Sequence, residues 1–401
     1  MERDVKVVVA AQVALNFSFT FVTVFLPFYI REASHLDAQG TLLWTGLIMG
    51  AAPFAASITS PFWAHFTTKA SPKGVFEKGI ISNFIAVLLM GLITNIRVLF
   101  ALRLLQGLLG GLSTIGLIIT TVASSKERLT RNIGIYQSGM TLGQLSGPPI
   151  GAAVASAFGF RAAFLVAAGF MLLILAFSRW GLGRIPPQQP APRGTRSSTP
   201  MFPSWLLCFT SMIQISFFAS VLPDLLAWLR VAPERAVAAA GLVVTSYGVS
   251  AAVGSYLIDR VAPSVPRRTV VLAAALSAAA LQLLLAATSS LLAFTVVRMV
   301  QAGLVAGIMP LVISQVARQA GGVAIGTLNT ARFAAHATGP LLATSVLSVA
   351  SPFTLFALIS GLSLGSLLTY LRSTAGFPSS GAGLTSGDED PPRSGHEPDS
   401  L

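Results

Sequence analysis

Charged residues and cysteine are both scarce in this sequence. Only 10% of its 401 residues are charged, and 53% are hydrophobic, whereas soluble domains carry about 25% charged residues. A soluble fold of this composition would lack a polar surface, so the composition excludes that class. The single cysteine, Cys208, excludes an internal disulfide framework.

Signatures of catalysis and of nucleotide binding are missing as well. None of the lysines is followed by Ser or Thr, which excludes the P-loop of an ATP-driven transporter. No cluster of metal ligands and no nucleophile–base pair occurs, because the histidines are scattered along the chain: His35, His65, His336 and His396. We therefore expect no enzyme activity, no catalytic residue, no metal site and no bound cofactor.

What the sequence does contain is a succession of apolar stretches about 20 residues long, the length at which a helix crosses about 30 Å of hydrocarbon. Backbone groups in lipid must be satisfied within the segment, so each stretch is expected to be helical. The sequence predicts an all-α polytopic membrane protein with about twelve transmembrane helices, at residues 7–30, 42–63, 76–95, 98–121, 133–156, 160–181, 204–229, 236–257, 269–288, 291–314, 323–348 and 352–371.

Basic residues are unevenly distributed between the predicted loops. The net charge of +12 comes from 26 basic and 14 acidic residues. With the N-terminus in the cytoplasm, eighteen basic residues fall in cytoplasmic segments, five outside, and three (Arg103, Arg298 and Arg332) within spans. The positive-inside rule then places both termini in the cytoplasm of a multi-pass cell-membrane protein. The charge reflects topology, so the expected partner is the lipid bilayer and no nucleic acid is expected.

The predicted spans fall into two sets of six. Residues 1–182 are expected to form an N-terminal six-helix bundle, and residues 204–372 a C-terminal one. The segment 183–203 is polar and Pro-rich, which is typical of a linker, here cytoplasmic. Residues 373–401 are rich in Gly, Ser, Pro and acid, and are expected to be a disordered cytoplasmic tail.

The two sets of spans share short motifs, which indicates an internal repeat. Three pairs recur in corresponding helices at offsets of about 192 to 196 residues: Leu26-Pro27 with Leu222-Pro223, Arg103 and Gln106 with Arg298 and Gln301, and Gly147-Pro148 with Gly339-Pro340. Parallel six-helix repeats are related by a pseudo-twofold axis and hold a substrate site between the halves near the bilayer midplane.

The fifth predicted span carries the most specific motif. Spacing by four residues puts its glycines on one smooth helix face, beside which Pro148 bends the helix: Gly139, Gly143, Gly147 and Gly151. Close packing alone explains the glycines. Together with Gly-Pro in a fifth span, the stretch resembles the antiporter motif of the major facilitator superfamily, with Ala152 in place of the last glycine. This resemblance implies an exporter rather than an importer.

The loop after the second span resembles the cytoplasmic gating loop of the same superfamily, in which an acid–base pair latches the outward-facing state. Thr68 replaces the aspartate of that pair, so only Lys69 and Lys73 correspond to the family's gating residues. Asp259 and Arg260 retain an acid–base pair at the end of the eighth span. The resemblance therefore implies that the latch has shifted to the C-terminal half.

In the fourth span, Arg103, Gln106 and Gly107 resemble a motif whose buried arginine is linked to proton transfer in this superfamily. The ordered series of motifs extends through nearly the whole chain and resembles the twelve-span multidrug-efflux branch of drug:proton antiporters. The resemblance implies a proton gradient as energy source, a small amphiphilic substrate and a monomer. Two alternatives remain: a metabolite uniporter or importer, and a transport-inactive membrane sensor on the same fold.

Asp224 is the one acidic residue well inside an apolar run. Removal from water favours the protonated form of a carboxyl group, so Asp224 is a candidate for proton coupling, together with Arg103 and His336. The alternative for Asp224 is a place near the outer membrane face, where it caps a helix or pairs with Arg230 or Arg235.

Polar residues in several spans are candidates for the lining of a substrate cavity. Arg332 and His336 share one helix face with Asn329, and few polar groups in an apolar setting suit a tolerant pocket. The candidate cavity residues are Asn16, Thr20, Gln144, Gln214, Tyr247, Asn329 and Arg332. Three arginines against one acid within the spans favour neutral or anionic amphiphiles, provided that backbone carbonyls do not satisfy the arginines.

Overall fold

The computed structural model describes residues 2–67, 69–109, 111–125, 128–186, 201–261 and 265–374. All regular structure within these residues is helical, as the sequence predicts. In chain order the elements are α1 (Glu2–Ala33), α2 (Ala38–Phe66), α3 (Pro72–Leu92), α4 (Ile96–Leu108), α5 (Leu112–Ala123), α6 (Leu129–Gly181), α7 (Phe202–Ser216), α8 (Phe218–Trp228), α9 (Pro233–Val261), α10 (Arg267–Leu284), the 3-10 helix η1 (Leu285–Ala287), α11 (Leu291–Ala306), α12 (Ile308–Leu347) and α13 (Pro352–Thr374).

The helices are long and apolar enough for a multi-pass membrane protein. Among the described residues, nine segments can cross a membrane, and ten if α7 and α8, which meet at a 45° bend, form one broken span. Helix α6 holds two predicted spans, 133–156 and 160–181, and breaks between them at Gly159. The φ of 80° at Gly159 is one that glycine adopts without strain.

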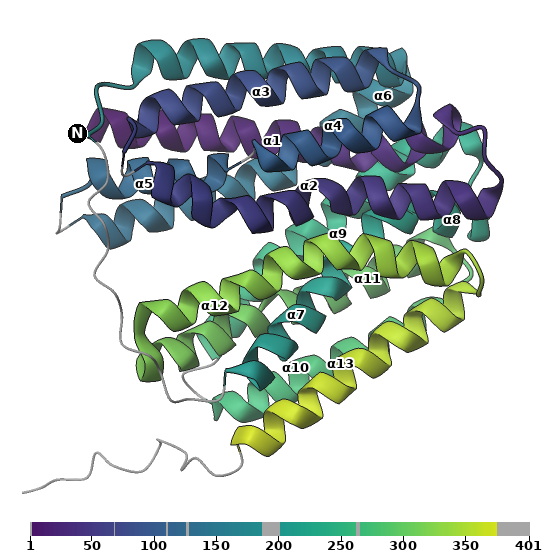
Figure 1. Ribbon diagram of the computed structural model, residues 1–401. Helices are drawn as coiled ribbons and strands as arrows, with labels where there is room; N and C mark the ends of the chain where they lie inside the picture. The colour runs from purple at the N-terminus through teal and green to yellow at the C-terminus, as the bar shows by residue number, and fades with distance from the viewer. Residues whose placement is uncertain are drawn as a thin grey trace, which may run out of the picture.

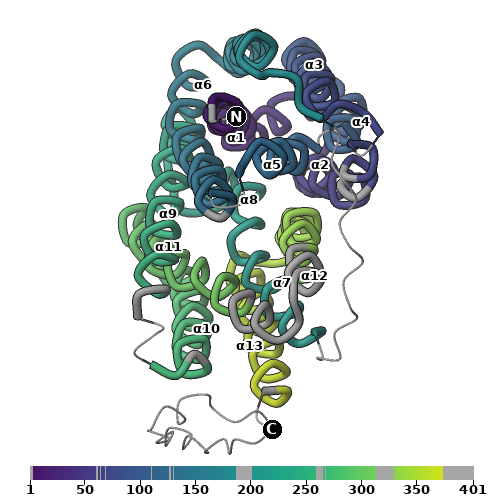
Figure 2. Tube along the Cα trace, turned by 90° about the vertical axis from the view of Figure 1, so that its left-hand side faces the viewer, coloured from purple at the N-terminus to yellow at the C-terminus, as the bar shows by residue number. Residues whose placement is uncertain are grey.

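The helices form two groups, α1 to α6 and α7 to α13, which lie one above the other in Figure 1 and again in the turned view of Figure 2. Their packing repeats as the sequence predicts. Helix α1 packs on α6 and α2 on α4, while in the second group α7 packs on α12 and α9 on α11. We call these groups the N half and the C half. Most of the predicted linker 183–203 and tail 373–401 lies outside the described residues.

The helix ends gather at two opposite ends of the molecule (Figure 1). We call the end that holds residues 2–6 and 182–186 the proximal end; it lies at the left of Figure 1, where the N-terminus is marked. The end that holds the loops at residues 34–37 and 229–232 is the distal end. The topology predicted from the basic residues places the proximal end in the cytoplasm.

Buried apolar side chains join the two halves through the distal part of α1. One cluster includes Phe21, Phe25 and Ile30 of α1 and continues into the C half. A second cluster contains Val8 and Leu15, from the proximal part of α1, and its members all belong to the N half. The shared core therefore lies toward the distal end.

Candidate functional site between the two halves

Helices α2 and α12 approach each other at backbone distance across the halves. A Cβ atom on Gly46 would lie 3.0 Å from Cα of Leu341 and 3.1 Å from the carbonyl oxygen of Pro340. Gly50 lies in the same way against the carbonyl of Ala337. Because Cβ atoms hardly ever approach backbone atoms so closely, glycine is what permits this contact.

A second close contact joins α6 to α9. Gly241 of α9 lies against the side chain of Ala152, and a Cβ atom on it would be 3.2 Å from the carbonyl oxygen of Pro148. Farther along the pair, Gly248 lies against Leu145, with 2.9 Å between the position of a Cβ atom and Cδ2. The α6 motif therefore contributes to the interface between the halves.

Asp224 lies at the distal end and forms an ion pair with the opposite half. Nη2 of Arg31, on α1, donates to Oδ1 of Asp224, on α8, at 2.5 Å. The side chain of Asp224 is 20% exposed and that of Arg31 is 46% exposed. The alternative pairing of Asp224 with Arg230 or Arg235 is wrong, since the partner is Arg31.

The ion pair lines a recess of about 180 Å³ between the halves. Pro27 and Pro223, which the sequence relates as a repeated motif, both line this recess. Ser34 and, from α2, Thr41 and Thr45 add to its polar lining. The recess therefore joins the distal ends of α1, α2 and α8.

Three of the predicted cavity residues meet where α1 packs on α6. Nε2 of Gln144 donates to Oδ1 of Asn16 at 3.3 Å, and Nδ2 of Asn16 donates to the carbonyl of Gln12 at 2.9 Å. The Thr20 hydroxyl donates to the Asn16 carbonyl at 2.9 Å. The structure thus brings Asn16, Thr20 and Gln144 into one polar patch.

The glycine face of α6 packs on α1, within the N half. Gly143, Gly147 and Gly151 lie against backbone atoms of α1 between Val13 and Phe21, and Gly139 lies against side chains of α1. The predicted smooth face therefore exists, and its neighbour is α1. The side of α6 near Pro148 faces α9 instead.

Two other predicted cavity residues, Gln214 and Tyr247, contact a fully buried arginine. Arg298 donates from Nη2 to the Gln214 carbonyl at 2.8 Å and from Nη1 to Gln301. Its guanidinium carbon lies 4.4 Å from the ring centre of Phe218 and 4.7 Å from that of Tyr247. This arrangement combines neutral hydrogen-bond acceptors with cation–π contacts.

A glutamine network surrounds this arginine. Nε2 of Gln301 lies within donating distance of Oε1 of Gln214, at 2.6 Å, and of Gln282, at 2.8 Å. Gln214 in turn donates to the Ser363 hydroxyl at 2.9 Å. Neither Gln282 nor Ser363 was expected from the sequence. The repeat of Arg103 and Gln106 at Arg298 and Gln301 was the signal that marks this site.

Arg103 occupies the equivalent position in the N half. Its Nη1 donates to Oε1 of Gln106 at 2.8 Å, and its Nε donates to the Ile48 carbonyl at 3.3 Å. Both repeated arginines therefore donate to neutral acceptors, although Nε of Arg298 is buried without a hydrogen-bond partner among the described residues. Arg103 and Asp224, both described, form no ion pair with each other, since Asp224 pairs with Arg31.

Arg332 and His336 lie on α12, where Nδ1 of His336 is 2.8 Å from the Arg332 carbonyl. Within the described part of the chain, no hydrogen bond or ion pair engages the Arg332 guanidinium. The side chain of Asn329, which the sequence places on the same face, lies outside the described residues.

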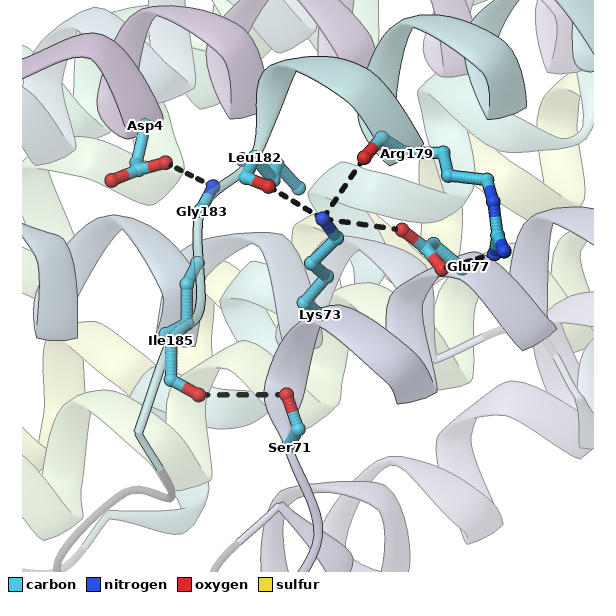
Figure 3. Close-up of polar contacts among 8 residues, drawn as sticks. All are labelled: Asp4, Ser71, Lys73, Glu77, Arg179, Leu182, Gly183 and Ile185. Carbon is cyan, nitrogen blue, oxygen red and sulfur yellow. Dashed lines mark hydrogen bonds and ion pairs between the residues drawn. The ribbon is translucent and has the colours of Figure 1, made fainter.

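Lys73 connects helix ends within the N half (Figure 3). Its Nζ donates to the carbonyls of Arg179, at 3.0 Å, and Leu182, at 2.5 Å, at the end of α6. Glu77 lies 3.8 Å from Nζ of Lys73 and 3.6 Å from Nη1 of Arg179. Lys73 thus caps the C-terminal end of α6, and all of these contacts lie within the N half.

Two further bonds fasten the chain after α6. Oδ1 of Asp4 accepts from the Gly183 amide at 2.7 Å, and the Ser71 hydroxyl donates to the Ile185 carbonyl at 3.4 Å (Figure 3). The side chain of Lys69 is exposed. The predicted gating position Thr68 and the side chains of Asp259 and Arg260 lie outside the described residues.

Comparison with known proteins identifies relatives of this chain. A family model described as the Major Facilitator Superfamily matches residues 8–231. The multidrug resistance protein MdtG of Citrobacter koseri is 32% identical over 168 residues, which is 40% of this chain and 41% of MdtG. An uncharacterized MFS-type transporter of Bacillus subtilis, YuxJ, is 29% identical over 149 residues, 37% of this chain and 38% of YuxJ. The chain thus matches about two fifths of the length of these relatives.

Solved structures share the fold over nearly the whole chain. The human organic anion transporter MFSD10 (TETRAN) has a TM-score of 0.67 at 19% identity, over 92% of this chain and 99% of that protein. The nucleoside transporter NupG, solved as a point mutant, has a TM-score of 0.72 at 13% identity, over 92% of this chain and 99% of NupG. These likenesses concern the fold.

Proposed function

The chain belongs to the major facilitator superfamily, whose members are transporters rather than enzymes, and from this premise we propose that it exports small amphiphilic compounds in exchange for protons. In this proposal the two halves rock against each other, so that a central site opens alternately to the two sides of the membrane. In one state the halves are in contact at their distal ends, and in the other at their proximal ends. In this proposal, the contacts of Arg31 with Asp224 and of Gly46 with Leu341 belong to the state with the distal end closed.

The observation that carries the proposal is the ion pair between Arg31 and Asp224. It joins the halves at the distal end, so opening that end has to break it. A proton on Asp224 removes the negative charge that holds Arg31 and lowers the free-energy cost of opening. Proton binding at Asp224 would therefore favour the state in which the distal end is open.

Release of the proton toward the proximal end requires a further group. His336 lies on α12, proximal to the contact of Ala337 with Gly50, and its imidazole is the kind of group that exchanges protons near neutral pH. Arg103 is the other candidate, although its bonds to Gln106 and Ile48 hold it in place. The Arg332 guanidinium, one helix turn from His336, opposes a second positive charge on the imidazole, so His336 and Arg103 stay alternative candidates for this step.

The direction of transport rests on the α6 motif and on the relatives. Gly143, Gly147 and Gly151 form the predicted antiporter face, and several relatives carry the name of multidrug resistance protein. Both support export of drug-like amphiphiles. A uniporter or importer would move substrate without a requirement for an opposing pH gradient.

We also propose a cell-membrane location with both termini in the cytoplasm and a monomeric state. Lys73, Arg179 and Arg184 lie at the proximal end, as the positive-inside rule requires for a cytoplasmic side. Reporter fusions to both termini that are active only in the cytoplasm test the orientation. Activity of a periplasm-specific reporter at either terminus would contradict it.

Flux measurements in proteoliposomes test the function. Purified chain is reconstituted with a pH gradient. The movement of the amphiphiles ethidium and 8-anilinonaphthalene-1-sulfonate is followed by their own fluorescence, and proton movement is recorded with a pH-sensitive dye in the lumen. We expect substrate movement coupled to opposite proton movement, reduced at least tenfold by Asp224→Asn. The control Glu234→Gln removes an exposed acid from α9 and should leave flux unchanged.

Three outcomes contradict the proposal in different ways. Flux of the wild type that ignores the pH gradient indicates a uniporter. An absence of flux for every amphiphile indicates a sensor. Unchanged pH-driven flux in Asp224→Asn refutes the role of Asp224 alone.

A further inference from the structure

We infer that Arg332 is the acceptor for a negatively charged group of the substrate, so that the transported amphiphiles are anions that carry a carboxylate, sulfonate or phosphate. This inference rests on the proposed transport function and specifies its substrate class.

Two edges of α12 are occupied by neighbouring helices. Ala337 and Leu341 lie against Gly50 and Gly46 of α2, and Gly339 lies against Ser216 of α7. A helix turns by about 100° per residue, so Arg332 and His336 fall on the face between these two edges. This face looks into the space between the halves.

The same face changes from closed to accessible along the helix. At its distal part Pro340 and Ala343 are buried, whereas Arg332 and His336, nearer the proximal end, are partly exposed. Solvent accessibility on this face therefore increases toward the proximal end, which is the end at which a site with a closed distal end would open. A substrate that enters from the proximal end would therefore reach Arg332 before the buried distal part of this face.

Arg332 differs from the other arginines within the spans. Arg103 and Arg298 are engaged by glutamines and backbone carbonyls, which hold their charges within their own halves. The guanidinium of Arg332 has no such partner among the described residues. A cation in this setting is costly unless water or an anion solvates it.

The interior offers no carboxylate to Arg332 within the described ranges. Asp224 is paired with Arg31 at the distal end, and Glu77 with Lys73 and Arg179 at the proximal end. The other acids of the described residues whose side chains are placed lie at helix ends or in loops: Asp4, Glu32, Asp37 and Glu234. Asp259, whose side chain is outside the described part, is at the proximal end of α9. Among the described residues, no carboxylate therefore accompanies Arg332 in the space between the halves.

An arginine recognises an anionic group through its rigid fork of donors. Carboxylates and sulfonates accept two parallel N–H bonds from it, which adds direction to the attraction. The half-buried ring of Phe333 stands next to Arg332 on the side toward α2 and offers apolar contact. A flat amphiphile with one anionic group fits this combination.

Binding of two probes that differ in a single charged group tests the inference. 8-Anilinonaphthalene-1-sulfonate and N-phenyl-1-naphthylamine share one ring system, and only the first carries a sulfonate. Each is titrated by fluorescence against the purified chain in phosphatidylcholine nanodiscs, with empty nanodiscs subtracted. We expect the wild type to bind the sulfonate about tenfold tighter, the gain typical of one charge-assisted bond.

Substitution of Arg332 should affect only the charged probe. Arg332→Gln is expected to lose about tenfold in sulfonate affinity and to change binding of the neutral probe by less than about twofold. Arg332→Lys should retain part of the preference, because it keeps the charge without the fork. Arg97→Gln, which removes an exposed arginine at the start of α4, is the matched control and should bind both probes as the wild type does.

The inference is overturned if Arg332→Gln keeps the full preference for the sulfonate, or if the wild type shows none. It is also overturned if wild-type chain binds the cation ethidium more tightly than the sulfonate. Should Arg332→Gln fail to fold, Arg332→Lys and the wild-type preference still decide. Sulfonate binding that depends on Arg332, without any flux, would support this inference and contradict the proposed function. Proton-coupled export of ethidium that is unchanged in Arg332→Gln would support the proposed function and contradict this inference.

Discussion

Arg31 of α1 and Asp224 of α8 form an ion pair with 2.5 Å between Nη2 and Oδ1, and the two residues are 193 positions apart in the sequence. The pair joins the two halves at the distal end. Its neighbours are Pro27 and Pro223, the two prolines of the repeated motif. The two copies of the repeated motif thus line one recess between the halves.

Loss of Arg31 should favour opening of the distal end. Because the Arg31 side chain is 46% exposed, we expect Arg31→Gln to weaken closure by at most about 1 kcal/mol, or about fivefold in the ratio of states. Labelling of a cysteine placed at Thr45, which lines the recess and is buried, by a membrane-impermeant thiol reagent measures opening. Arg97→Gln is the control, and equal labelling in Arg31→Gln and wild type would argue against the pair as a closing contact.

Gly241 should be sensitive to a single methyl group. In Gly241→Ala the new Cβ meets the side chain of Ala152, so the α6–α9 contact has to separate. We expect faster distal labelling and a lower melting temperature. Adding Ala152→Gly should largely reverse both effects, whereas Gly169→Ala, where no atom lies within 4 Å of a Cβ, should have neither. A double variant as impaired as Gly241→Ala would refute this account.

Lys73 is predicted to stabilise the N half through the end of α6. Lys73→Met loses two bonds to helix C-terminal carbonyls and the contact with Glu77, which together are worth about 1–3 kcal/mol. We expect a lower melting temperature and faster tryptic cleavage after Arg184. The exposed Lys69 supplies the control Lys69→Met. A normal melting temperature with altered gating in Lys73→Met would instead support the family's gating role.

Gln301 and Gln106 occupy equivalent positions and should differ in their effect on stability. Gln301→Leu deprives the fully buried Arg298 of an acceptor and breaks the bonds to Gln214 and Gln282, at a cost of about 1–3 kcal/mol for each group left unsatisfied. Gln106→Leu leaves Arg103 its bond to Ile48. Thermal unfolding should show the larger loss in Gln301→Leu, and an equal loss in both would be inconsistent with the network.

The sequence predicted the helical architecture and the repeat because both depend on local patterns. Apolar length indicates a span, and the glycine spacing of α6 indicates one smooth face, without knowledge of the neighbour. That this neighbour is α1 follows from three-dimensional packing alone. The break within α6 at Gly159 sits between two predicted spans, where the hydropathy pattern already separates them.

The partners of the charged residues were harder to predict. For Asp224 the sequence offered Arg230 and Arg235, which are close along the chain, whereas the partner Arg31 belongs to the other half. Lys73 was expected in a gating loop from its motif, and its bonds to Arg179 and Leu182 depend on where α6 ends. Such pairings depend on the tertiary structure, which cannot be predicted from the periodicity of a single helix.

A distance measurement across the distal end tests the central claim, which is alternating access controlled by Asp224. Spin labels are placed at Leu36 in the N half and Val349 in the C half, both exposed, after replacement of the buried Cys208 by Ala. Double electron–electron resonance in nanodiscs should show one short distance at about pH 8 and a second, longer population at about pH 5, because protonation of Asp224 releases Arg31. In Asp224→Asn the populations should no longer depend on pH. A single distance at both pH values in the wild type, or an unchanged pH response in Asp224→Asn, would contradict the account.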